Sequence, residues 1–113
     1  MAKEQIKQTK ATIVFTENVL ALSGVLDFDS VVGLEDEGSH WLINKAPQNC
    51  WLDLRSVSRC SSAGLALLLV WLQVALQHKK VLVIENVPQD MMSMAKLVGL
   101  DKSLPELQQS KIN

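Results

Sequence analysis

Two mostly apolar segments near the start of the chain, separated by a polar pair, predict two short strands. The segments ATIVFTEN (11–18) and VLALSG (19–24) have the composition of strands, and Glu17 and Asn18 form a predicted turn between them. Gly24 ends the second segment. Strands joined by so short a turn pair in an antiparallel way.

A helix is predicted next, over about residues 30–45. Asp29 or Ser30 is the candidate N-cap. Gly33 and Gly38 weaken the helix, and Pro47 closes the region. Its apolar side consists of Val31, Val32, Leu34, Leu42 and Ile43.

The remaining pattern alternates between strand and helix. CWLDL (50–54) predicts a strand, and a helix follows over about 62–78. The continuous, β-branched run VLVIENV (81–87) is typical of a strand buried on both faces. A last helix is expected from Pro88 to about Val98, and Gly99 stops it. This order predicts an α/β fold in one domain, with a small mixed sheet of about four strands packed with α-helices.

The helix predicted at 62–78 begins within RCSSAGLALLLVWL (59–72), and its first three turns are apolar on every side. Winding the helix places Leu65, Leu68, Leu69, Leu72 and Leu76 on the side expected to face the sheet. The opposite side is also apolar and contains Ala63, Leu67, Val70, Trp71 and Val74. We expect this second side to bind a partner protein, with Trp71 as an anchor. Another helix of the same chain, or a homodimer contact formed when the partner is absent, is the alternative.

The two serines before the helix have three interpretations. Ser62 would cap the helix, or its phosphorylation would place a negative charge at a helix N-terminus. A serine nucleophile is disfavoured because CSSAG does not match the G-x-S-x-G elbow. His78 lies roughly 24 Å from the serines along the same helix, which is too far to activate either of them. Nothing around His40 suggests a catalytic triad.

Composition narrows the classes of function. The 113 residues have a formal net charge of −1, which gives no electrostatic reason to expect nucleic acid binding. The polar N-terminus carries no export signal, and the apolar run 63–72 is too short to span a bilayer, so a cytoplasmic protein is expected. Cys50 is predicted in a strand and Cys60 in a loop, and the two do not have the spacing of metal ligands. We expect neither a metal nor another cofactor.

Several segments together resemble the STAS domain family. They are LALSGVLD followed by a helix, CWLDLRSVSRCSSAGLALLL, VLVIENV and MAKLVGLDKSLP. The resemblance covers residues 12–107, which leaves 1–11 as a flexible lead and 108–113 as a tail. It implies the fold of anti-sigma factor antagonists and of the cytoplasmic ends of sulfate transporters.

Within that family the chain is most similar to the STAS subunits of bacterial phospholipid-transport ABC complexes. This similarity implies a non-enzymatic subunit that binds the cytosolic ATPase, and through it a membrane permease, and supports outer-membrane lipid asymmetry. It also implies that the Ser62 hydroxyl lies at the interface with the ATPase. It places the protein at the inner membrane through its partner, without insertion of its own. The alternative is an anti-sigma factor antagonist regulated by phosphorylation at Ser62, which matches the family's hydroxyl residue. Ser61 stands where the family has an aspartate, which weakens that alternative.

Overall fold

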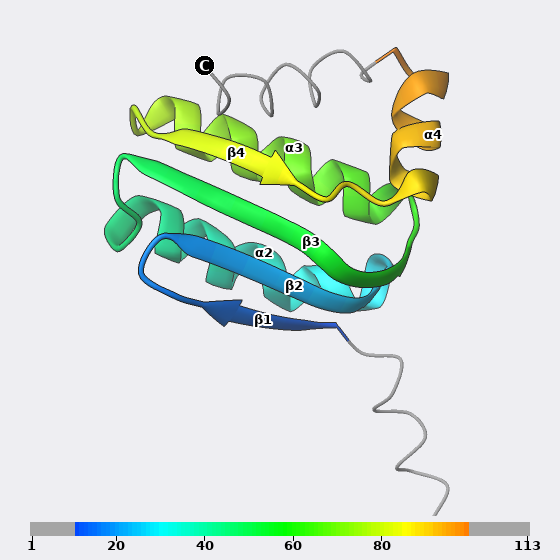
Figure 1. Ribbon diagram of the computed structural model, residues 1–113, viewed down its shortest axis with the longest axis horizontal. Coiled ribbons are helices and arrows are strands. Elements are labelled where there is room, and N and C mark those ends of the chain that lie inside the picture. Colours follow the sequence, from blue (N-terminus) through cyan, green and yellow to red (C-terminus); the bar gives the residue numbers. More distant parts are fainter. Residues whose placement is uncertain (1–10, 100–113) are drawn as a thin grey trace, which may run out of the picture.

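The computed structural model describes residues 11–99, and a four-stranded mixed sheet forms its centre (Figure 1). The strands are β1 (Thr12–Phe15), β2 (Val19–Leu26), β3 (Asn49–Cys60) and β4 (Val81–Glu85), and they lie side by side in that order. β1 pairs with β2 in an antiparallel way, whereas β2 with β3 and β3 with β4 are parallel. The predicted α/β fold and mixed sheet are confirmed.

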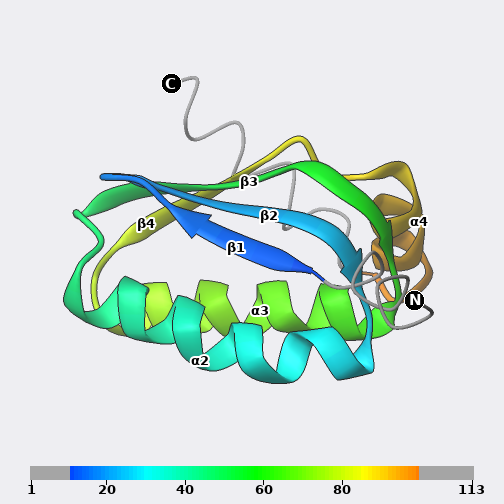
Figure 2. The same ribbon diagram turned by 90° about the horizontal axis from the view of Figure 1, so that it is seen from below.

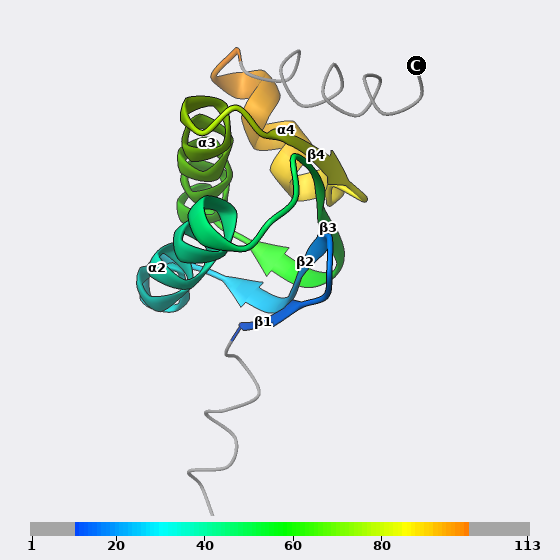
Figure 3. The ribbon, with the colours of Figure 1, turned by 90° about the vertical axis from the view of Figure 1, so that its left-hand side faces the viewer.

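The helices of this region are α2 (Phe28–Asn44), α3 (Ser62–Gln77) and α4 (Gln89–Leu97). Figure 2 shows α2 and α3 next to each other along one face of the sheet, and both begin at the same end of the molecule. Figure 3, seen along these helices, shows them as one layer and the sheet as a second layer. α4 lies at the end of the sheet where β3 finishes and α3 starts. β2 and β3 are therefore each followed by a helix that runs back across the sheet, whereas α4, which follows β4, stays at its end.

The core lies between the sheet and the layer of α2 and α3. Alternate residues of the strands point into it, since side chains of a strand point to opposite faces in turn. Leucines at these positions are almost completely buried, and so is Leu68 of α3 below them. The inward strand residues are Leu20, Leu22, Leu52, Leu54, Leu82 and Ile84.

The start of α2 differs from the predicted one. Asp27, rather than Asp29 or Ser30, is the N-cap. Its Oδ1 accepts a hydrogen bond from the Ser30 N–H at 3.0 Å, and the Ser30 hydroxyl accepts one from the Asp27 N–H at 2.9 Å. This reciprocal capping box satisfies two N–H groups at once, and it places Phe28 in the first turn of the helix.

The other end of α2 is capped by a side chain from the loop between α3 and β4. Its last turn contains no basic residue. Lys80 Nζ instead donates to the Leu42 carbonyl and, at 2.8 Å, to the Ala46 carbonyl. The ammonium group thus satisfies carbonyl groups that the end of a helix leaves unpaired.

β3 is much longer than the predicted strand at 50–54. It continues to Cys60 and stays paired with β2, whose register shifts between Ala21 and Ser23 and again between Gly24 and Val25. Only Val57 is buried between Arg55 and Arg59, so this half of the strand has little apolar pattern. The prediction that Cys60 lies in a loop was wrong for that reason. The shorter strand at 81–85, with a helix from Gln89, differs from prediction by two residues or fewer.

Candidate partner-binding site

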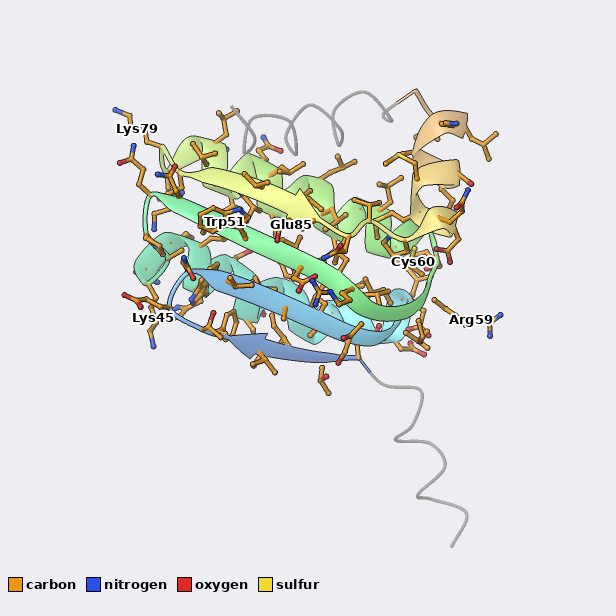
Figure 4. The ribbon with its side chains drawn as sticks, viewed as in Figure 1. Lys45, Trp51, Arg59, Cys60, Lys79 and Glu85 are labelled. Atoms are coloured by element: carbon orange, nitrogen blue, oxygen red, sulfur yellow. The ribbon has the colours of Figure 1, made fainter. Side chains whose placement is uncertain are left out.

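The turn from β3 into α3 is fixed by main-chain hydrogen bonds to two other elements. The Cys60 N–H donates to Asp90 Oδ2 at 3.3 Å, and the Ser61 N–H donates to the Leu26 carbonyl at 2.8 Å. Asp90 belongs to the first turn of α4, and Leu26 is the last residue of β2. Figure 4 shows Cys60 at this end of β3, close to the start of α4. The beginning of α3 is thus held in place by both β2 and α4.

The Cys60 thiol is a weak nucleophile in this position. Burial and the neighbouring Asp90 carboxylate raise its pKa to about 12. Both effects disfavour the thiolate, the form that reacts and binds metals. Cys60 therefore has a structural role at this turn.

Ser61, rather than Ser62, caps α3. Its side chain accepts a hydrogen bond from the Ala63 N–H at 3.2 Å. Ser62 is the first helical residue and is exposed. No hydrogen bond joins its hydroxyl to any residue within 11–99. The predicted capping role of Ser62 was wrong, and the correction leaves its hydroxyl open to solvent at the helix N-terminus.

Gly64 allows α3 to begin close to the sheet. A Cβ atom at this position would lie 3.0 Å from Leu26 Cβ and 3.2 Å from Cys60 Cβ. Both neighbours are Cβ atoms, which move only with the backbone. In the segment CSSAG, then, Cys60 and Gly64 fix the turn, Ser61 caps the helix, and Ser62 faces outward.

The side of α3 that was expected to bind a partner is largely buried within the chain. Trp71 is 0% exposed, and Leu67 and Ala63 are also buried. The Trp71 indole lies against Gly38 of α2, and its Nε1–H donates to the Glu35 carbonyl at 3.3 Å. The expectation that Ala63, Leu67 and Trp71 face a partner was wrong, because all three are buried within the chain and α2 packs against Trp71. Val70 is exposed and Val74 is half-buried, whereas Leu76, expected to face the sheet, is 76% exposed.

A different set of residues forms the exposed surface along these helices. In α3, Ser62, Ala66 and Val70 face solvent at intervals of four residues, as one stripe of a helix does. In α2, Phe28 and Val32 are 72% and 71% exposed. The two helices are parallel, and the contact of Trp71 with Gly38 fixes their alignment, so that Val32 lies at about the level of Ala66. We call these five residues the two-helix surface.

Charge is distributed unevenly around the two-helix surface. No charged residue occurs in α3. The charged residues of α2 are all acidic and exposed, and they are Asp29, Glu35, Asp36 and Glu37. Glu35 lies on the α3 side of α2, where its carbonyl accepts from the Trp71 indole, whereas Asp36 and Glu37 line a pocket with Phe15 and Trp41 on the side of β1.

The sequence prediction missed Phe28, Val32 and Ala66. Phe28 and Val32 are separated by four residues, which is the spacing of one helix face, and this signal was available. Ala66 follows from the stripe that contains Ser62 and Val70. The spacing of apolar residues in the sequence could not show that α2 lies beside α3.

Comparison with known proteins decides the family. A family model described as "Mlab, STAS domain" matches residues 10–109. This chain belongs to the STAS domain family. The match spans nearly all of the 113 residues, so the STAS domain accounts for every element described above.

Solved structures with the same fold include two anti-sigma factor antagonists. SpoIIAA in its unphosphorylated form has a TM-score of 0.65 and 16% identity, over 81% of this chain and 83% of that one. An anti-sigma factor antagonist from Mycobacterium paratuberculosis has a TM-score of 0.64 and 22% identity, over 86% and 85% of the two chains. A sulfate transporter family protein from Wolinella succinogenes has a TM-score of 0.62 and 18% identity, over 80% and 73%. No curated protein sequence matches significantly. At these identities the likeness establishes the STAS fold.

Within residues 11–99, no group of three or more His, Cys, Asp or Glu residues is placed to hold a metal ion. None of the helices in the same range is long and apolar enough to cross a membrane. His78 Nδ1 contacts the Val74 carbonyl at the end of α3, and His40 Nδ1 contacts Asn44 Nδ2 on α2. Both histidines are exposed and lie away from Ser62, which begins α3.

Proposed function

We propose that the protein is a non-enzymatic STAS subunit that binds the cytosolic ATPase of an ABC complex for phospholipid transport between membranes. The two-helix surface is the docking surface in this proposal. The family model that matches the chain carries the description Mlab, and the chain itself resembles the STAS subunits of such complexes. Through the ATPase the protein would reside at the inner membrane and support outer-membrane lipid asymmetry.

The observation that carries the proposal is the exposure of large apolar side chains on the two-helix surface. Phe28 and Val32 are open to water although the core beside them is well filled. Exposed apolar residues that gather on one surface indicate a protein–protein contact more often than isolated ones do. Phe28 is an aromatic residue of the kind that contributes most to such contacts.

A permanent complex fits this surface better than a reversible complex that is controlled by phosphorylation. The bound partner would cover these apolar residues. α3 has no charged residue that could repel the partner. The family's aspartate is replaced by Ser61, which is occupied as the cap of α3. Docking needs neither the aspartate nor a modification of Ser62.

The test compares two substitutions on one helix by affinity purification from native membranes. Val70→Glu places a charge within the two-helix surface and should abolish recovery of an ABC ATPase, identified by mass spectrometry of its nucleotide-binding peptides. Leu76→Glu places the same charge on an exposed apolar position of α3 outside that surface, and recovery should persist. Circular dichroism of both variants checks that α3 has formed. Equal recovery with both variants, or no ATPase with the unaltered chain, would contradict the proposal.

The second candidate is an anti-sigma factor antagonist controlled by phosphorylation. It is favoured by the exposed Ser62 hydroxyl, which has no hydrogen-bond partner among residues 11–99, because a phosphate at the first turn of a helix is stabilised by the unpaired N–H groups there. Two of the proteins with this fold are anti-sigma factor antagonists. If the purification instead recovers a serine kinase and Ser62→Glu releases it while Ser62→Ala does not, this candidate replaces the first.

A further inference from the structure

A pocket lies between β1 and the side of α2 that faces this strand. Its volume is about 350 Å³, which is within the range of small-molecule sites in proteins. The lining residues are Phe15, Asp36, Glu37, His40, Trp41 and Lys45. Phe15 comes from β1, and the others come from α2 and its C-cap. None of them belongs to the two-helix surface, so the pocket is separate from the proposed docking surface.

Two aromatic rings form the apolar wall of the pocket. The Phe15 ring stacks on the Trp41 ring, with centroids 5.4 Å apart. Trp41 is buried in the core, whereas Phe15 is exposed at the pocket. The buried ring thus holds the exposed one in place. A wall that is fixed beforehand loses little conformational freedom when a ligand binds against it, and it suits the methylene chain of an aliphatic molecule.

The charged residues of the pocket are separated by sign along α2. Glu37, Trp41 and Lys45 follow one another at intervals of four residues, so they lie on one side of the helix, about one turn apart. Glu37 is therefore roughly 12 Å from Lys45 along the helix axis, with Trp41 between them. Asp36 adds a second carboxylate beside Glu37. The pocket has an acidic end, an aromatic middle and a basic end.

Both charged ends remain available to a ligand. No hydrogen bond or ion pair joins the side chains of Asp36, Glu37 or Lys45 to any residue within 11–99. Figure 4 shows Lys45 at the end of the molecule where α2 finishes. The carbonyl groups at the end of a helix disfavour an anion, but here Lys80 Nζ already binds two of them. A carboxylate can therefore approach Lys45 without meeting an uncompensated helix end.

We infer that this pocket binds a small aliphatic zwitterion, which carries an ammonium group at one end and a carboxylate at the other, as an ω-amino acid does. The ammonium group contacts Asp36 and Glu37, and the carboxylate contacts Lys45. The methylene chain between them lies on Phe15 and Trp41. A cation without a carboxylate would leave Lys45 unpaired, and an anion without an ammonium group would meet two carboxylates. The zwitterion is the class of ligand that complements both ends.

The first test is a titration of the isotope-labelled chain by NMR spectroscopy at neutral pH. The probes are 6-aminohexanoate, hexylamine and hexanoate, which share one chain length and carry both charges, only the ammonium group, or only the carboxylate. The backbone amide signals of Phe15 and Trp41 should shift with 6-aminohexanoate, and the dissociation constant should be millimolar because the charges are exposed. Each probe with one charge should bind about two- to fivefold more weakly, which is the effect of one exposed ion pair.

The second test uses substitutions with matched controls. Glu37→Gln and Lys45→Gln each remove the charge from one end and should weaken 6-aminohexanoate by about two- to fivefold. Glu35→Gln removes an exposed carboxylate on the α3 side of the same helix, and Lys79→Gln removes an exposed ammonium group outside the pocket. Both controls should leave the affinity unchanged. Lys45→Gln should not weaken hexylamine, which lacks the group that Lys45 binds.

The outcomes decide whether the pocket selects a zwitterion. Three results would each overturn the inference: no shift at Phe15 and Trp41, equal affinity for hexylamine and 6-aminohexanoate, or equal weakening by Glu37→Gln and Glu35→Gln. Added salt should weaken 6-aminohexanoate, because salt screens exposed charges. Circular dichroism of the four variants checks that each one is folded, as expected for substitutions at exposed positions.

Discussion

Two neighbouring sides of α3, neither of them charged, have opposite surroundings. Toward α2, Ala63, Leu67 and Trp71 are buried, whereas Ser62, Ala66 and Val70 face solvent one position away along the helix. What separates them is the presence of α2, which lies close enough for Trp71 to contact Gly38. Hydrophobicity alone therefore does not show which side of a helix is available to another protein. The predictions below test this contrast.

Truncation of Trp71 should have the largest effect. Trp71→Ala removes a completely buried indole and its hydrogen bond to the Glu35 carbonyl. We expect the free energy of unfolding to fall by about 3–5 kcal/mol. Val70→Ala, one residue earlier and exposed, should change it by about 0.5 kcal/mol or less. Urea denaturation measures both values, and similar losses in the two variants would mean that the two sides of α3 do not differ as described.

The two glycines of α2 should respond in opposite ways to alanine. At Gly38 a Cβ atom would lie 2.2 Å from Trp71 Cζ2, and the buried indole has no room to move. Gly38→Ala should lower the free energy of unfolding by about 1–3 kcal/mol. Nothing lies within 4 Å of the corresponding atom at Gly33. Gly33→Ala should raise it by up to about 1 kcal/mol, because alanine favours the helix. A stabilising effect of Gly38→Ala in thermal unfolding would contradict the packing of α2 on α3.

The adjacent serines allow a finer comparison at the start of α3. Ser61→Ala removes the N-cap and should lower the free energy of unfolding by about 0.5–2 kcal/mol. Ser62→Ala removes a hydroxyl without a partner in residues 11–99 and should change it by less than about 0.5 kcal/mol. Chemical denaturation of the two variants decides which serine is the cap. The reverse order would restore Ser62 to that role.

At neutral pH the smallest effect on stability concerns Cys60, whose shifted pKa matters only as the pH approaches 9 and above. Its raised pKa, about 12 against an ordinary value of 9.0, should make its reaction with iodoacetamide slow at pH 8. Asp90→Asn removes the adjacent negative charge, which lowers the pKa and accelerates labelling. The unfolded thiol ionises above about pH 9 while the native one does not, so stability should fall as pH rises from about 9 toward 12. Peptide mass spectrometry follows Cys60, with the buried Cys50 as the unreactive internal control.

The fold could be predicted from the sequence because local patterns specified each element. The apolar segment 19–24 predicted β2, and the order of strands and helices required parallel crossovers. The end of β3 escaped prediction because residues 55–59 are mostly polar. Their strand conformation depends on pairing with β2, which no local pattern reports.

The candidate site was predictable only in part. The sequence identified α3 and placed Ser62 at its start, but it could not tell which neighbour covers Trp71. The periodicity of a helix gives angles around its own axis and contains no information about adjacent elements. From the sequence, Gly38 was interpreted only as a residue that weakens the helix. In the structure the missing side chain is what allows the two helices to approach.

The contact between Gly38 and Trp71 also restricts how the sequence can change over evolutionary time. Because a Cβ atom at position 38 would overlap the indole at position 71, the two positions are not free to vary independently. A homologue with a larger residue at the first position should carry a smaller one at the second. The amino acid without a side chain therefore determines which residues are permitted on the neighbouring helix.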